Sequence, residues 1–284
     1  MSRLVKAMKR AQSIRKENEP LSESKTRSSK EDTVKGSEKK EKKEIRINYS
    51  KTRVEKINKE TLRKNKVFAL FKEQRTTDEM ERLRTQVLKK LRESGGNCLM
   101  VTSAHPGEGK TFTSINLGIS IAKQLDKTVL LIDCDLRNPW RHHFDFSSDF
   151  FGLNVKKGLA DYLLENIKIE EILINPGIEK LTLLPGGRPV ANSSELLGSQ
   201  KMEDLITELK TRYSEDRILI FDCPAMLACT DPLVFSHLMD GIILVVASER
   251  TNPEEIKRVV ELLNDRPIFG TILNKSKDQR DSYV

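Results

Sequence analysis

Six short apolar runs lie after residue 97, and stretches with helical periodicity separate them. None of the runs contains a charged residue, and most are rich in branched side chains, which is typical of strands buried on both faces. Strands that alternate with helices predict an α/β fold, a mostly parallel central sheet with helices on both faces. The predicted strands are residues 98–102, 128–132, 181–184, 218–221, 241–246 and 268–273.

The segment "AHPGEGKT", residues 104–111, lies between the first apolar run and a helical stretch. Strand, glycine-rich loop and helix in this order are the context that a phosphate-binding loop requires. Lys110 is expected to supply a positive charge to the β- and γ-phosphates of a nucleotide, and the Thr111 hydroxyl to ligate Mg²⁺. The residues expected to bind the nucleotide in this segment are Pro106, Gly107, Glu108, Gly109, Lys110, Thr111 and Phe112.

Carboxylates follow two further predicted strands. "LLIDCDLR" places Asp133, Asp135 and Arg137 after one strand, and "ILIFDCP" places Asp222 after another. A single strand-end aspartate commonly caps a turn, but open α/β sheets bind ligands at the carboxyl ends of their strands, where these three would converge. Lys110, Asp133, Asp135 and Asp222 are therefore the predicted catalytic residues.

Each of these side chains has an expected role in phosphoryl transfer. Thr111, Asp133 and Asp222 are the predicted metal ligands, with Asp222 binding Mg²⁺ directly or through water. Asp133 is also the predicted general base, and Asp135 a second metal contact. Arg137 is expected to neutralise phosphate charge or to bridge subunits.

The front of the chain has a different composition. Residues 1–66 contain 22 Lys and Arg against 10 Asp and Glu, with Tyr49 as the only aromatic residue. Residues 17–66 are therefore predicted to be a disordered charged linker. Residues 1–16 place Leu4, Met8, Ala11 and Ile14 on one stripe of a short basic helix that suits an anionic membrane or a partner. A folded domain over residues 67–277 and a flexible tail over residues 278–284 complete the predicted organisation.

Several classes of protein are disfavoured by what the sequence lacks. No run is long enough to span a bilayer and no signal peptide is visible, which predicts a cytoplasmic protein, with peripheral contact at the inner face of the membrane through residues 1–16. The basic front has almost no aromatic residues, so nucleic acid is not the expected partner. The four cysteines stand singly in or near apolar runs and are expected to be core residues.

Helix signals mark several boundaries. Residues 78–93 form an amphipathic pattern that ends at two glycines. Ser193 or Ser194 is expected to cap a helix that carries Leu196 to Leu209, and Asn252 with Pro253 to begin another. Residues 158–173 are predicted to be a helix.

The order of these motifs resembles that of the bacterial tyrosine autokinases of exopolysaccharide and capsule biosynthesis. The resemblance covers residues 78–275 and includes "SAHPGEGKT", "LLIDCDLR", "ILIFDCP", Asp231, "DGIILVVAS" and "GTILNK". The opening "MSRLVKAMKR" is similar to the start of single-chain members associated with exosortase-type loci. The resemblance implies a P-loop NTPase fold, ATP and Mg²⁺ as cofactors, and an adenine contact from Asn274. It also implies a homo-oligomer and a membrane polysaccharide co-polymerase as activator.

The chain departs from the family pattern at three places. The C-terminal tail is "KSKDQRDSYV", with Tyr283 as its one tyrosine instead of a cluster. The oligomerisation motif ExxRxxR is represented by Asp78, Glu81 and Arg84. A single proline, Pro224, follows the "ILIFDC" strand where the family commonly has two.

Three hypotheses remain at the level of sequence. The leading one is an ATP-dependent tyrosine autokinase, with Tyr283 or Tyr49 as phosphoacceptor and Tyr162 and Tyr213 as poor ones in helical segments. The second is a P-loop ATPase switch of the partitioning or division-site type; His105 disfavours it, because those relatives place an extra lysine early in the loop. The third is a nucleotide-regulated binding module.

Overall fold

The computed structural model describes residues 52–55, 57–71, 74–137, 146–212 and 216–276. The predicted helix over residues 1–16, the two candidate phosphoacceptors Tyr49 and Tyr283, and the tail over residues 278–284 lie outside the described residues.

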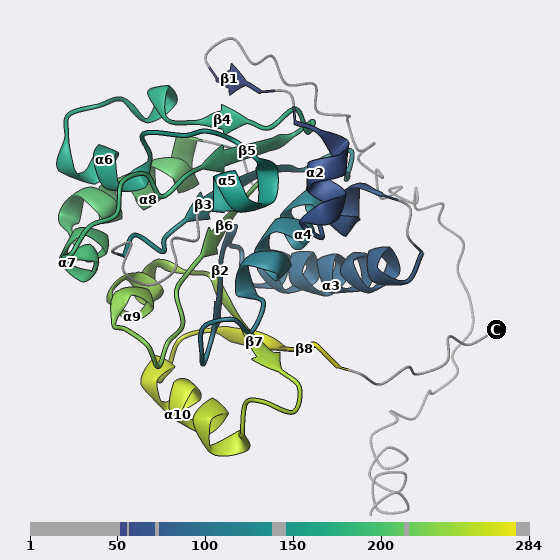
Figure 1. The fold of residues 1–284 in the computed structure, drawn as a ribbon. Coiled ribbons are helices and arrows are strands. Elements are labelled where there is room, and N and C mark those ends of the chain that lie inside the picture. The colour runs from purple at the N-terminus through teal and green to yellow at the C-terminus, as the bar shows by residue number, and fades with distance from the viewer. Residues whose placement is uncertain (1–51, 56, 72–73, 138–145, 213–215, 277–284) are drawn as a thin grey trace, which may run out of the picture. The chain divides into compact units, whose positions relative to one another are not determined.

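An eight-stranded sheet forms the centre of the fold (Figure 1). The strand order is β1-β4-β5-β3-β6-β2-β7-β8, and every neighbouring pair is parallel except β4 and β5. The strands are β1 Arg53–Val54, β2 Cys98–Ser103, β3 Thr128–Asp133, β4 Ile174–Asn175, β5 Leu181–Leu184, β6 Arg217–Asp222, β7 Gly241–Ala247 and β8 Ile268–Asn274.

The six predicted strands are confirmed, and most are one residue longer at an end than the apolar runs. β1 and β4 were not predicted because each has only two residues, too few to show a period-2 pattern. The strands from β2 to β7 in the middle of the sheet are almost wholly buried, as uncharged runs require.

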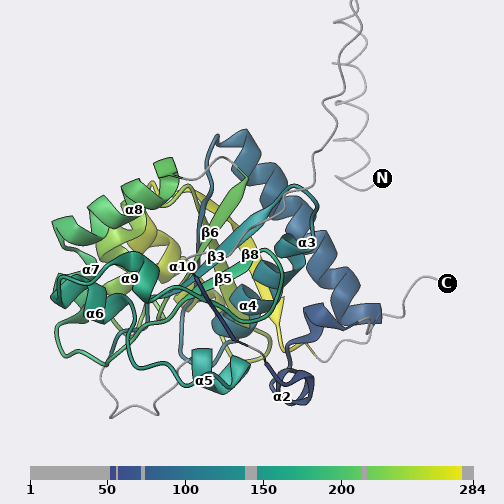
Figure 2. The same ribbon diagram turned by 90° about the horizontal axis from the view of Figure 1, so that it is seen from above.

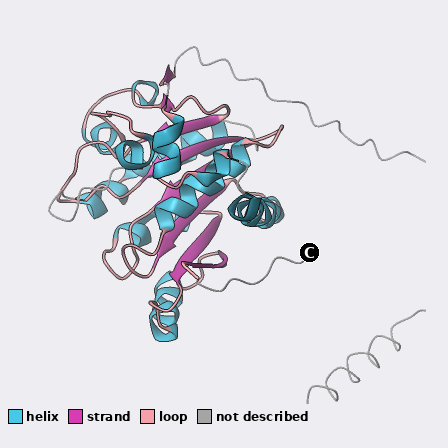
Figure 3. Cartoon of the chain, turned by 45° about the vertical axis from the view of Figure 1, so that its right-hand side comes forward, coloured by secondary structure: helices cyan, strands magenta, loops and turns pink. Residues whose placement is uncertain are grey.

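Helices cover both faces of the sheet (Figures 2 and 3). They are α2 Lys59–Lys64, α3 Gln74–Glu93, α4 Lys110–Ala122, α5 Phe146–Phe151, α6 Leu159–Leu164, α7 Ser193–Leu197, α8 Gln200–Arg212, α9 Asp231–Phe235 and α10 Pro253–Leu263. Short 3₁₀ turns lie at η1 Phe68–Leu70, η2 Ile169–Glu171 and η3 Ser236–Leu238. In the part of the chain that the structure describes, no helix is long and apolar enough to cross a membrane.

The side-chain alternation of each strand divides the core into two. Leu99 and Val101 of β2 pack with α2 to α5, whereas Cys98 and Met100 pack with α6 to α10. Successive residues of a strand point to opposite faces, so one run without charges serves both halves of the core. This explains why the strands read as continuous apolar runs.

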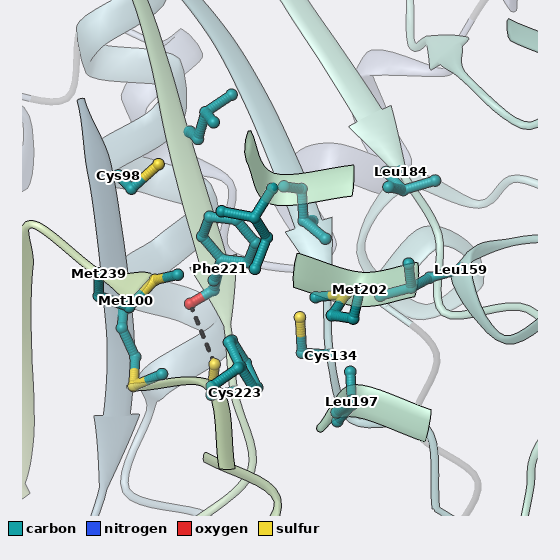
Figure 4. Close-up of a cluster of buried hydrophobic side chains, with 14 of the residues drawn as sticks. Cys98, Met100, Cys134, Leu159, Leu184, Leu197, Met202, Phe221, Cys223 and Met239 are labelled. Carbon is teal, nitrogen blue, oxygen red and sulfur yellow. Dashed lines mark hydrogen bonds between the residues drawn. The ribbon is translucent and has the colours of Figure 1, made fainter. Parts of the chain in front are cut away.

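Buried cysteines anchor the two strands that end in aspartate (Figure 4). Cys134 follows Asp133, Cys223 follows Asp222, and both thiols are fully buried in the half of the core that contains Phe221. Burial raises the pKa of both thiols above the ordinary cysteine value, so they remain protonated core side chains. The prediction of core cysteines is confirmed for these two and for Cys98, and Cys229 is half-buried.

Two predicted helices are wrong in part. The helix expected to carry Leu196 to Leu209 is interrupted at Gly198 and forms α7 and α8. The N-cap residue of α7 is Asn192 and not Ser193 or Ser194 as predicted. The Ser194 hydroxyl donates to Asp231 Oδ1 at 2.7 Å. The helix expected over residues 158–173 ends at Leu164, because Glu165 is extended and its carbonyl accepts from Lys201 Nζ at 2.8 Å. The start of α10 is as predicted, with a capping box between Asn252 and Glu255.

Two elements, β1 and α2, lie within the range predicted as linker. α2 begins after Asn58, whose side chain accepts from the backbone N–H of Glu60 at 2.8 Å. Leu62 and Val67 are buried against the α4 side of the sheet. Helical structure is therefore present before residue 67, and Leu62 of α2 belongs to the core.

Candidate active site

The phosphate loop connects β2 to α4 with the geometry that its glycines predict. Gly107 and Gly109 have φ values of 79° and 100°, in the left-handed region that a side chain disfavours. A Cβ atom at Gly109 would also clash with the side-chain amide of Asn274. α4 begins directly after the loop, at Lys110, so its first amides lie beside the loop.

The side chain of Glu108 points into the protein, where neighbouring segments bind it. It is fully buried, and its carboxylate accepts from the backbone N–H of His105 at 2.9 Å and from the hydroxyl of Thr251. His105 in turn lies 2.8 Å from Glu255 on α10, where hydrogen bonds from Asn252 and then from His105 lower the pKa of the Glu255 carboxyl. Only the backbone of Glu108 is thus placed to contact a nucleotide.

Asp133 and Asp222 occupy paired positions on adjacent parallel strands, β3 and β6. Both are buried, with 5% and 4% of their surface exposed. Burial raises the pKa of Asp222 to about 6, while Lys110 and hydrogen bonds from Thr111 and Ser114 oppose the rise. Lys110 and Thr111 thus lie beside Asp222, and Asp133 is paired with Asp222 on the next strand; Asp135, the third carboxylate of the predicted cluster, is exposed after the end of β3.

Ser114 was not identified from the sequence. Its hydroxyl donates to Asp222 Oδ1 at 3.0 Å, so Ser114 holds the carboxylate from the second turn of α4. The available signal was its spacing of three residues from Thr111, which places both side chains on one face of the helix.

Asp135 and Arg137 lie on the loop that leaves β3. Asp135 is exposed, and its backbone N–H donates to Asp133 Oδ1 at 3.0 Å. Arg137 Nε lies 3.6 Å from Asp135 and 3.7 Å from Asp231 Oδ2, and its terminal nitrogen donates to the carbonyl of Ala228 at 3.4 Å. Arg137 is therefore held between an exposed and a buried carboxylate.

The remaining predicted contacts divide into two groups. Pro106 is exposed at the loop, whereas the ring of Phe112 packs edge-to-face on Phe68 at 6.2 Å between centroids. The Asn274 side chain donates to the Glu108 carbonyl at 2.8 Å, and Lys275, which was not predicted, donates to the Gly107 carbonyl at 2.6 Å. Both residues reach the loop from the end of β8.

The oxygen donors at this site suit Mg²⁺. Mg²⁺ is usually held by one or two carboxylates together with substrate phosphates and water. Thr111 and Asp222 provide a hydroxyl and a carboxylate in mutual contact, and Asp133 lies on the next strand. Within the described ranges, no group of three or more His, Cys, Asp or Glu side chains is placed to hold a metal ion by itself.

Known proteins are similar to this chain in sequence and in fold. A family model described as "AAA domain" matches residues 97–265. The chain is 36% identical over 186 residues to the tyrosine-protein kinase YwqD of Bacillus subtilis, covering 65% of this chain and 74% of that protein. It is 31% identical to a putative tyrosine-protein kinase in the cps region of Klebsiella pneumoniae, covering 68% of this chain but only 26% of that protein.

Solved structures agree with the sequence matches. The kinase domain of the Escherichia coli tyrosine kinase ETK has 30% identity and a TM-score of 0.61, covering 72% of this chain and 78% of that domain. The septum site-determining protein MinD of Pyrococcus horikoshii, complexed with Mg-ADP, is more distant, with 24% identity and a TM-score of 0.51 over 65% of this chain and 73% of that protein. That likeness shows a shared fold alone.

The AAA domain match spans more than half of the chain, and the Bacillus kinase is matched over most of its length. The chain therefore belongs to the bacterial tyrosine-protein kinase family of P-loop proteins and is an ATP-dependent tyrosine kinase.

Proposed function

We propose that the protein is an autokinase that transfers the γ-phosphate of ATP to tyrosines of neighbouring copies, and that this controls the synthesis and export of an extracellular polysaccharide. One observation carries the proposal. Side chains from one helix and two strands lie together beside the phosphate loop, in which Gly107 and Gly109 have left-handed φ values. These side chains are Lys110, Thr111, Asp133 and Asp222. Phosphoryl transfer depends mainly on positioning and charge neutralisation, which this set supplies.

The nucleotide is proposed to lie along the phosphate loop. The backbone N–H groups of residues 107–112 surround the phosphates, and Lys110 neutralises the β- and γ-phosphates. Mg²⁺ would be held by Thr111, Asp222 and Asp133, where it neutralises charge on the phosphates. Asp135 would provide a second contact to the metal ion.

Asp133 is the proposed general base. It is buried, and it is fixed on β3 beside Asp222 and by the backbone N–H of Asp135. The tyrosine hydroxyl oxygen forms a bond to the γ-phosphorus, the bond to the bridging oxygen of ADP breaks, and Asp133 accepts the hydroxyl proton. Arg137, on the same loop, neutralises charge on the transferred group.

Tyr283 and Tyr49 are the proposed phosphoacceptors, because each belongs to a segment predicted to be flexible. Transfer between copies requires an assembly, and we propose a homo-oligomer. Arg84, which corresponds to part of the family's oligomerisation motif, donates to the carbonyl of Ser120 in its own chain at 3.1 Å. Its side chain is only 13% exposed, so any interface here must use other residues.

The proposed cellular context follows from the similarity to the tyrosine kinases of capsule and exopolysaccharide loci. A membrane co-polymerase for polysaccharide chain length would act as the activator, and the basic residues 1–16 would bring this cytoplasmic protein to the membrane surface.

Transfer between copies is tested by mixing two forms of the full-length protein with γ-labelled ATP and Mg²⁺. A tagged Lys110→Met form keeps its tyrosines, and an untagged active form carries Tyr49→Phe and Tyr283→Phe. Label on the tagged form supports transfer between copies. If only free phosphate is produced, water is the acceptor, and the protein is an ATPase switch, the alternative that a C-terminal tail with a single tyrosine, Tyr283, favours.

A further inference from the structure

Two residues at the end of β8 contact consecutive carbonyls of the phosphate loop. Lys275 Nζ donates to the Gly107 carbonyl at 2.6 Å, and Asn274 Nδ2 donates to the Glu108 carbonyl at 2.8 Å. The next carbonyl, that of Gly109, accepts from the backbone N–H and the hydroxyl of Thr113. Three successive loop carbonyls are thus each held by a donor.

These contacts decide where the loop amides point. In a trans peptide the N–H group points opposite to the carbonyl of the same peptide plane. Holding the Gly107 and Glu108 carbonyls at β8 therefore directs the N–H groups of Glu108 and Gly109 away from β8. Successive amides that point to one side form a concave site for an anion.

The orientation of the Asn274 amide is fixed by its own contacts. Its oxygen accepts from the backbone N–H of Lys275 at 2.9 Å, so its nitrogen must face the Glu108 carbonyl. Lys275 has a φ of 60°, an unusual conformation for a residue with a side chain. Gly109 lacks the Cβ that would clash with Asn274, so the close approach requires glycine.

The opposite side of the loop is fixed independently. The buried carboxylate of Glu108 bonds to Thr251 and to the backbone of His105. With Asn274 and Lys275 on the backbone side, the peptide planes on both sides of Glu108 are constrained before any ligand arrives. Preorganised amides bind an anion without the cost of ordering the loop.

We infer that Asn274 and Lys275 are positioning residues for the nucleotide phosphates, acting through the peptide planes of residues 107–109. The inference rests on the nucleotide site proposed above, and it differs from the adenine contact that family resemblance implies for Asn274. It assigns both residues to triphosphate binding, whether or not a base is attached.

Inorganic tripolyphosphate distinguishes a phosphate-positioning role from an adenine contact, because it has phosphates but no base. Calorimetry in the presence of Mg²⁺ measures how tightly the full-length variants Lys275→Met and Asn274→Asp each bind tripolyphosphate and ATP. We expect both ligands to lose about tenfold in affinity in each variant, since each change removes one donor that orients the loop. Lys275→Arg, which retains a donor, should recover most of the loss.

Matched controls are available on the surface of α10 and just after it. Lys257→Met and Asn264→Asp change the same residue types at exposed positions without a contact to the loop, and both affinities should stay at the parental value. Unfolding curves of Lys275→Met and the parent protein should coincide, because the side chain is exposed.

Three results would overturn the inference. They are a loss of ATP affinity with unchanged tripolyphosphate affinity, unchanged affinity for both ligands, and a parent protein that binds ATP but not tripolyphosphate. If the parent binds both ligands and the variants lose both, but no tyrosine is ever labelled, the proposed kinase function fails while the positioning role stands.

Discussion

Arg137 Nε lies 3.7 Å from Asp231 Oδ2, and across the described ranges neither atom has a hydrogen-bond partner although both are buried. The other oxygen of Asp231 is held by Ser194 at 2.7 Å. The pair joins the loop after β3 to the start of α9, with the two charges close but not in hydrogen-bond contact.

Replacing Asp231 alone should destabilise the protein more than replacing Asp231 and Arg137 together. Asp231→Leu leaves the Arg137 charge without its buried partner, and we expect the free energy of unfolding to fall by about 2 kcal/mol, less than for a fully buried arginine because Arg137 is 28% exposed. The double variant Arg137→Met/Asp231→Leu should recover most of the stability. Urea unfolding measures both.

The exposed Asp78→Leu provides the control, with an expected change within about 0.5 kcal/mol. The single variant Arg137→Met completes the comparison: a loss in the double variant equal to the sum of the losses in Arg137→Met and Asp231→Leu would show that the two side chains do not interact.

Lys110 is expected to be required for nucleotide binding but not for folding. Its side chain is half-exposed at the start of α4, so Lys110→Met should abolish Mg²⁺-dependent ATP binding while the protein still folds. Calorimetry checks the binding, with Lys257→Met as the exposed lysine control. Unchanged ATP affinity would disprove the assignment.

The paired aspartates are expected to act mainly on the rate. Asp133→Asn and Asp222→Asn should each lower turnover by about 100-fold or more and weaken ATP binding far less, because their charges matter most as the phosphoryl group transfers. Steady-state kinetics together with direct binding measurements separate the two effects. Equal losses in rate and affinity would mean that the carboxylates only position the nucleotide.

Arg84 is expected to stabilise the chain itself. Its guanidinium donates to the Ser120 carbonyl and joins α3 to α4, so Arg84→Ala should lower the free energy of unfolding by about 1–2 kcal/mol. The exposed Arg82→Ala on the same helix is the control. Sedimentation should give the same assembly state for both variants; dissociation with Arg84→Ala alone would place this residue at an interface.

Local patterns predicted most of the fold because the strands of an α/β sheet are buried on both faces and so appear in the sequence as apolar runs. Runs such as residues 128–132 carry that information in themselves, and the phosphate loop is a contiguous motif. Asp133 and Asp222 each follow a predicted strand, and the carboxyl ends of parallel strands lie at the same edge of the sheet. The sequence therefore predicted that the two side chains lie close together, as their pairing on β3 and β6 confirms.

Contacts between distant segments were not predictable in this way. Thr251 and Lys275 reach the phosphate loop from more than 140 residues away, and no periodicity marks such a pairing. The break between α7 and α8 lies at Gly198 and Ser199, and the link from Ser194 to Asp231 exists only once α7 and α9 are packed. Such specific side-chain contacts depend on tertiary packing.

Mapping the phosphate after reaction tests the kinase account most directly. The full-length protein is incubated with γ-labelled ATP and Mg²⁺, with and without a membrane co-polymerase partner, and its four tyrosines are examined by peptide mapping. The account predicts label on Tyr283 or Tyr49, lost when that residue is replaced by phenylalanine and absent from Asp133→Asn protein. Consumption of ATP with release of free phosphate and no labelled tyrosine under either condition would contradict it.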